Sequence, residues 1–234
     1  MSMKYHFVSL GSFCGVAMEL ERIGLRQESL PFDWLITEDL DSVLWLISNN
    51  FEGFLEKDDL YQEKTPDYYF NKRFSIHFYH DFVSTKSLVE QYDAVIEKYR
   101  RRIKRFYEII SYPTVFIRSC VGGETEYILK HQEEIESLLK SFNKDNRIIY
   151  ISAGNAASLS NLYCVEGKNR KHFLEALPEL KTFLLDSTDL TCEQIEANLV
   201  RYRKRNGGGI RKLKRYVRKY FRIGIYVHPK QYRK

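Results

Sequence analysis

Apolar and polar positions change their spacing several times along the chain, and each change marks a predicted element. Strands are predicted where short, nearly continuous apolar runs occur, a pattern typical of strands covered on both faces. These runs lie at residues 5–10, 112–119, 146–155 and 180–187. The aromatic-rich segment 67–82 predicts one or two further short strands.

Helices are predicted where apolar residues recur at every third or fourth position. This spacing is most regular in residues 87–110, and it also predicts helices over 13–23, 39–56, 124–142 and 190–205. A glycine directly follows the first of these helices, as a C-terminal cap would. Strands that alternate with helices predict an α/β class domain of three layers, in which helices cover both faces of a mainly parallel central sheet.

Composition divides the chain into two parts. The 234 residues, of which 44% are hydrophobic, are enough for one sizeable core. From Arg201 to Lys234 there are 14 Lys and Arg residues and no acidic residue, which leaves the first 200 residues with a formal charge of −8. We therefore predict an α/β domain over residues 1–206 and a basic helical tail over 207–234, separated by a run of glycines.

The tail itself predicts a partner. Within residues 210–222, Ile210, Leu213 and Val217 share one stripe while Lys and Arg fill the other positions. Such a helix suits peripheral contact with an anionic membrane. The alternative is that the stripe packs against the domain and the basic face is solvated. Nucleic acid is disfavoured as a partner because the body is acidic and carries no recognition motif.

Location and cofactors follow from what the sequence lacks. It contains no run of 18 apolar residues and no cleavable apolar segment near its start, so we expect a cytoplasmic protein, with membrane association through the tail. The four cysteines are scattered, which predicts free thiols and no zinc cluster. The turn "GSFCG" lacks the spacing of a phosphate-binding loop, so no nucleotide or other cofactor is predicted.

Cys14 is the candidate nucleophile. It lies three residues after Gly11, where the first predicted strand gives way to a helix, and ligands of parallel sheets bind beyond the carboxyl ends of the strands. A helix N-terminus favours the thiolate, and the N–H groups of Gly11, Ser12 and Phe13 are placed to bind an oxyanion. Alternatively Cys14 is a buried hydrophobe, and Ser12 is either a helix cap or itself a nucleophile.

Other predicted strands also end in polar residues. Arg118, which follows a buried run, either faces the site or pairs with a carboxylate. Asn155 and the segment Asp186–Asp189 are expected at the same sheet edge. We therefore predict that Arg118 and Asn155 bind substrate together with the turn that precedes Cys14.

A thiolate nucleophile needs a base, and His80 is the best candidate because it lies near a strand end and is followed by Asp81. His77 is expected on the opposite face of that strand, and His172 is the runner-up. Asp33 lies in the apolar stretch "PFDW", where it either caps a turn or orients a catalytic imidazole.

Together, "VSLGSFCGVAMELERIGLR", "PFDW", "HDF" and "FIR" resemble a bacterial family of unknown function described as "putative papain-like cysteine peptidase". The resemblance covers roughly residues 5–120 and implies Cys14 as nucleophile and His80 as base. A papain-like fold places the Cys helix in one lobe and the His on an antiparallel β-lobe.

The layout after the first strand is also similar to SGNH-type esterases, with a flavodoxin-like sheet, and to a capsule-associated acetyltransferase family. This chain lacks the Gly-Asp-Ser of the SGNH pattern. The second likeness implies a substrate among surface polysaccharides or glycan precursors, and a role in polysaccharide biosynthesis.

Three functions are compatible with these patterns. The leading hypothesis is a cysteine-dependent acyl-group hydrolase or transferase that acts on a small-molecule or glycan substrate, with Cys14 as nucleophile, His80 as base and Asp33 or Asp81 orienting the imidazole. The alternatives are a papain-like cysteine peptidase and a non-catalytic binding or scaffold protein in which Cys14 is structural.

Overall fold

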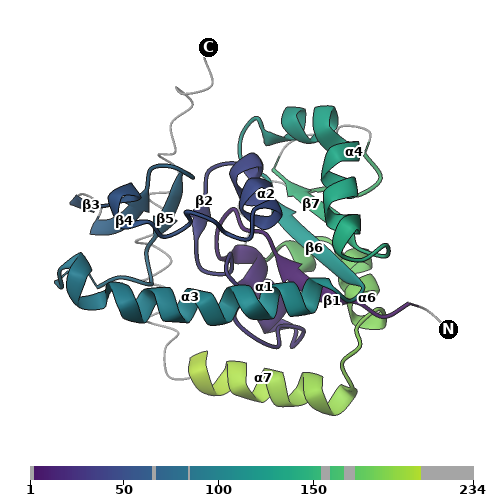
Figure 1. The fold of residues 1–234 in the computed structure, drawn as a ribbon. Helices are drawn as coiled ribbons and strands as arrows, with labels where there is room; N and C mark the ends of the chain where they lie inside the picture. The colour runs from purple at the N-terminus through teal and green to yellow at the C-terminus, as the bar shows by residue number, and fades with distance from the viewer. Residues whose placement is uncertain (1–2, 65–66, 84, 154–158, 166–171, 207–234) are drawn as a thin grey trace.

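The computed structural model describes residues 3–64, 67–83, 85–153, 159–165 and 172–206 and contains two sheets (Figure 1). The first is parallel, with the strand order β1-β6-β7-β8. Its strands are β1 (His6–Ser9), β6 (Thr114–Ser119), β7 (Arg147–Ser152) and β8 (Leu162–Cys164). All six residues of β6 are buried, as expected for a central strand covered on both faces. The predicted parallel α/β sheet is confirmed.

Side chains of the parallel sheet alternate between two separate hydrophobic clusters. Val115 and Ile117 of β6 face a cluster shared with α1 (Gly15–Arg22), α5 (Phe173–Ala176) and α6 (Pro178–Asp186). Phe116 faces the other cluster, to which α2 (Leu40–Ser48), α3 (Leu88–Ile110) and α4 (Glu124–Phe142) contribute. Helices therefore cover both faces of the sheet, which confirms the predicted three layers.

The second sheet is antiparallel, with the order β2-β5-β4-β3. Its strands are β2 (Ile36–Thr37), β3 (Leu60–Lys64), β4 (Asp67–Asn71) and β5 (Ile76–Phe78), and the short helix η1 (Lys57–Asp59) precedes β3. The aromatic segment 67–82 thus forms two strands, within the predicted range. The two sheets are joined where the Thr37 N–H donates to the Ser12 carbonyl over 2.8 Å.

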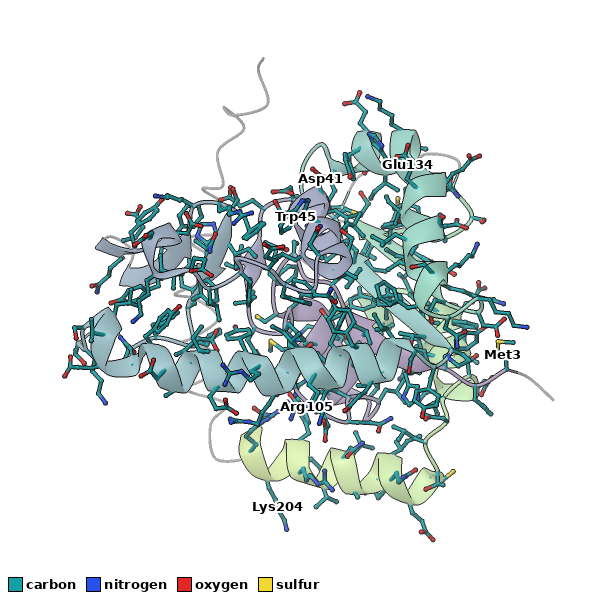
Figure 2. The ribbon with its side chains drawn as sticks, viewed as in Figure 1. Met3, Asp41, Trp45, Arg105, Glu134 and Lys204 are labelled. Carbon is teal, nitrogen blue, oxygen red and sulfur yellow. The ribbon has the colours of Figure 1, made fainter. Side chains whose placement is uncertain are left out.

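Two helices connect to their neighbours through side chains. The Tyr127 hydroxyl of α4 donates to Asp41 of α2, and Figure 2 shows Asp41 at the end of the molecule where α4 also carries Glu134. Arg105 extends from the side of α3 that faces α7 (Cys192–Asn206) in Figure 2 and donates to the Ser29 carbonyl over 2.8 Å.

No helix among the described residues has the length and apolar character needed to cross a membrane.

One predicted strand is wrong. Residues 180–187 belong largely to helix α6, which begins with Pro178 in its first turn. Leu180 and Leu184 lie one helical turn apart and are both buried, so the apolar run fits a helix face as well as a strand. Thr188 then pairs with Tyr5 ahead of β1. The segment Asp186–Asp189 therefore lies at the amino end of β1, and its predicted place at the carboxyl edge is also wrong.

Helices α3 and α4 match their predicted ranges, whereas α5 was not predicted. Helix α3 begins at a capping box in which Ser87 and Glu90 satisfy each other's backbone N–H groups. Gly24 has a φ of +80°, which suits the predicted glycine cap of α1. Helix α2 ends at Ser48, earlier than the predicted 39–56. The tail over 207–234, with its membrane stripe at 210–222, lies outside the described residues.

Candidate functional site

The turn that follows β1 is held at the carboxyl edge of the parallel sheet by a close approach of three elements. Gly11 has a φ of +86°, and a Cβ atom there would lie 2.8 Å from Thr37 Oγ1 and 3.1 Å from Arg118 Nη1. Only glycine fits both this backbone conformation and this space. The turn is further fixed by the Ser119 N–H, which donates to the Gly11 carbonyl over 3.1 Å.

Cys14 directly precedes helix α1 and is half-buried. The first bond of the helix runs from the Met18 N–H to the Cys14 carbonyl over 3.0 Å. The N–H groups of Gly15, Val16 and Ala17 therefore have no acceptor within the helix. Cys14 therefore lies at the positive end of the helix, as the sequence predicts, although its side chain makes no capping hydrogen bond there. None of the four cysteines, all of which are described, is disulfide-bonded.

The predicted oxyanion donors are partly engaged within the protein. The Gly11 N–H donates to Ser9 Oγ over 3.3 Å, and the Ser12 N–H donates to the Ser119 carbonyl over 3.4 Å. The first-turn N–H groups of α1 are thus better placed to serve as donors. The Phe13 ring lies against Gly15, where a Cβ atom would be 2.3 Å from the ring. Sequence reasoning missed this use of Gly15, although a glycine at the first helical position is a visible signal.

Arg118 is fully buried, and all five of its N–H donors face acceptors within the protein. Two donate to the Glu124 carboxylate over 3.0 and 2.7 Å. The others reach the Leu10 carbonyl at 2.8 Å and Thr37 Oγ1 and carbonyl at 2.6 and 3.5 Å. Of the two alternatives drawn from the sequence, pairing with a carboxylate is the one observed. Arg118 ties β1, β2 and α4 together, and its assignment to substrate binding stays a prediction.

Asp33 is also buried and pairs with Arg26. Its Oδ2 accepts from Arg26 Nε and Nη2 over 3.0 and 2.9 Å and from the Leu30 N–H over 2.9 Å. Burial raises the pKa of Asp33, while the Arg26 charge and the Leu30 N–H bond oppose that shift. These contacts match the turn-capping alternative, and an orienting role toward an imidazole stays a prediction.

His80 follows β5 and lies against the "PFDW" turn. Its ring meets the Trp34 ring edge-to-face, with centroids 6.2 Å apart, and the Arg26 guanidinium lies 5.0 Å from the centre of the Trp34 ring. The structure therefore brings the "PFDW" and "HDF" segments together through Trp34. Desolvation lowers the pKa of His80, and the positive charge of Lys98 adds to this effect, while Asp81 opposes it. His80 is nevertheless solvent-exposed, and the lowered pKa favours the neutral imidazole that a general base needs.

Asp81 is bound to helix α3. It accepts from the Tyr99 hydroxyl over 2.8 Å and pairs with Lys98 Nζ at 2.6 Å and with Arg102 at 3.5 Å. Its carboxyl group is almost fully buried, with 2% of the side chain exposed. These contacts fix the backbone directly after His80, and the predicted role of Asp81 in orienting the His80 imidazole stays a prediction.

The runner-up base, His172, has a different partner. Its Nδ1 lies 3.0 Å from Glu19 Oε1, and the Glu19 carboxylate is buried on α1 beside Arg22. Sequence reasoning missed this pair because the two residues are far apart in the chain. The other described histidines, His6, His77 and His131, lie beside Asp189, Glu38 and Glu134 respectively. Asn155, the last of the predicted substrate-binding residues, lies outside the described residues.

No group of three or more His, Cys, Asp or Glu side chains that could hold a metal ion occurs within the described ranges.

Comparisons with known proteins point to one family. A family model described as "Putative papain-like cysteine peptidase" matches residues 5–152. An uncharacterized protein of Acanthamoeba polyphaga mimivirus is 29% identical over 198 aligned residues, which cover 74% of this chain and 82% of that protein. No solved structure matches, so the likeness to SGNH-type esterases stays a prediction.

Proposed function

Because the chain belongs to the family described as "Putative papain-like cysteine peptidase", we propose that it is a cysteine-dependent hydrolase with Cys14 as nucleophile and His80 as general base. The observation that carries this proposal is the place of Cys14, half-buried at the first turn of α1 and at the carboxyl edge of the parallel sheet. Reactive cysteines lie in such electropositive, partly exposed positions.

The two sheets supply a frame that holds both residues. Ser12, two residues before Cys14, accepts from Thr37 of β2, and Thr37 pairs with Ile76 of β5. His80 follows β5 and contacts Trp34, which precedes β2. Cys14 thus precedes a helix, and His80 follows a strand of an antiparallel sheet. A papain-like arrangement, which the family's description implies, likewise has its Cys on a helix and its His on an antiparallel β-lobe.

The reaction that this arrangement supports is acyl transfer through a thioester. Neutral His80 takes the proton of the Cys14 thiol, the resulting thiolate attacks the carbonyl carbon of an ester or amide, and the N–H groups of the first turn of α1 stabilise the oxyanion. The imidazolium of His80 gives its proton to the departing alcohol or amine. Neutral His80 then takes a proton from the acceptor as this attacks the thioester. With water as acceptor the protein is a hydrolase, whereas a glycan hydroxyl would make it the acyltransferase predicted from the sequence.

The rate of thiol alkylation tests the proposed nucleophile without knowledge of the substrate. Iodoacetamide is applied at about pH 6.5, where an ordinary thiol is mostly protonated, and each cysteine is followed by peptide mass spectrometry. Cys164 is the matched control because it is half-buried like Cys14, and Cys192 is the exposed control. Cys14 is expected to react fastest although Cys192 is more accessible. If Cys14 reacts no faster than Cys192, the proposal is wrong.

The proposed base is tested with a matched pair of variants. His80→Gln is expected to slow alkylation of Cys14, whereas His172→Gln is expected to leave it unchanged. The reverse result would assign the base to His172. Cys14→Ser is expected to keep the fold and to abolish release of alcohol or amine from a panel of ester and amide substrates. Added glycans distinguish a transferase from a hydrolase, because only the former yields an acylated sugar.

A further inference from the structure

The antiparallel sheet carries aromatic rings on the face that points away from the core. Helix α3 runs along one side of this sheet in Figure 1, and Tyr69 and Phe78 belong to the hydrophobic cluster on that side. The strand register places Tyr61 opposite Phe70, and Phe70 opposite His77, on the other side. Because side chains alternate along a strand, Tyr68 and Tyr79 also lie there. We call these five residues the aromatic face.

The rings of the aromatic face form one continuous cluster. Centroids lie 4.5 Å apart for Tyr68 and Tyr79, 5.1 Å for Tyr68 and His77, 4.6 Å for Phe70 and His77, and 5.2 Å for Tyr61 and Phe70. Tyr61 is 40% exposed, and Tyr68, Phe70 and Tyr79 are half-buried. The outer face of an antiparallel sheet is ordinarily polar, so an exposed aromatic cluster there points to ligand binding.

The charges around these rings are negative. Glu38 Oε1 lies 2.7 Å from His77 Nε2, and 28% of the Glu38 side chain is exposed. Glu63 is paired with Tyr68 in the strand register. The pKa of the Tyr61 and Tyr68 hydroxyls is raised by burial and further by Glu63 and Glu38. Desolvation is the larger cause of both shifts, and the smaller contribution of Glu63 and Glu38 adds negative charge beside the electron-rich ring faces.

His77 contributes a further polar atom that lacks a partner. The residue is 8% exposed, and its Nδ1 has no hydrogen-bond partner. His77 Nε2 lies 2.7 Å from Glu38 Oε1, so Nδ1 is the ring atom that has no partner. The aromatic face therefore combines electron-rich rings with carboxylates at its margin.

We propose that the aromatic face binds an alkylammonium group, which contacts the rings of Tyr61 and Tyr68 by cation–π interaction and is neutralised by Glu38 and Glu63. This is the chemistry by which quaternary ammonium groups are recognised in aromatic cages. The proposal concerns a sheet surface distinct from Cys14 and does not depend on the proposed function.

The probe is choline, and its neutral isostere 3,3-dimethylbutan-1-ol is the control for shape. Binding to the full chain is followed by NMR chemical shifts of the tyrosine rings at constant ionic strength. Choline is expected to bind saturably, and the neutral isostere about tenfold more weakly, because only the cation gains from the rings and carboxylates. Equal binding of both compounds, binding of a neutral methyl glycoside in place of choline, or no saturable binding of choline would each overturn the proposal.

Variants locate the site. Tyr61→Leu and Glu38→Gln are each expected to weaken choline binding several-fold, and Glu38→Gln is also expected to reduce its dependence on salt. Tyr112→Leu is the matched control, since Tyr112 is a 60% exposed tyrosine outside the aromatic face. Far-UV circular dichroism checks that each variant is folded. If Tyr112→Leu weakens binding as much as Tyr61→Leu does, choline is not bound at the aromatic face.

Discussion

Replacing Arg118 by methionine tests how the carboxyl edge of the parallel sheet is held together. The substitution leaves the Glu124 carboxylate, whose side chain is 3% exposed, without its cationic partner. Breaking a buried ion pair in this way costs about 3–5 kcal/mol, out of a total stability of roughly 5–15 kcal/mol. The acceptors on Leu10 and Thr37 also lose their donor. At about 2–4 °C per kcal/mol for a chain of this size, the melting temperature is expected to fall by roughly 10 °C.

The assay is urea unfolding followed by circular dichroism, with two further variants. In Arg118→Met/Glu124→Leu the stranded charge is gone, so stability is expected to recover partly. Arg100→Met is the matched control, because the Arg100–Glu97 pair is 71% and 47% exposed and contributes about 1 kcal/mol or less. The reasoning is refuted if Arg118→Met unfolds at the same urea concentration as the unmodified protein, or if the double variant is less stable than Arg118→Met.

Three other outcomes follow from the structure. Gly11→Ala is expected to destabilise the fold by about 1–3 kcal/mol, because Gly11 has a positive φ and an added Cβ atom would contact Thr37. Thermal melting measures this effect, and an unchanged melting temperature would contradict it. Desolvation by the surrounding protein lowers the pKa of His80 below its value in the unfolded chain. The unfolded chain therefore binds a proton at a higher pH than the folded protein does, so stability is expected to fall as the pH drops below about 6.5. His80→Gln should lose less stability over the same range, and an equal loss would exclude His80 as the cause. Ser87→Ala removes the cap of α3 and is expected to cost about 1 kcal/mol by urea unfolding, whereas no change would mean that the capping box adds nothing to stability.

Local patterns were sufficient for most of the secondary structure. Continuous apolar runs located β1, β6 and β7, because nearly every side chain of a strand covered on both faces is buried and therefore apolar. Residues 180–187 show the limit of that signal, since a short apolar run fits either a strand or a buried helix face. In the structure Leu180 and Leu184 belong to one hydrophobic cluster with residues of α1 and α5, and together they form a buried helix face.

The sequence by itself also placed Cys14 at the start of a helix, because the change from an apolar run to helical spacing is local. The residues that surround the site, in contrast, come from distant parts of the chain. Arg118 binds Leu10 and Thr37, which are 108 and 81 residues away, and Glu19 meets His172 across 153 residues. A single sequence does not indicate which of these distant residues will be partners. Any buried charge needs a counter-charge, but which residue supplies it depends on which elements pack together. Tertiary structure alone therefore decided that Arg118 is enclosed among β1, β2 and α4, that Asp33 pairs with Arg26, and that the rings of β3, β4 and β5 share one face.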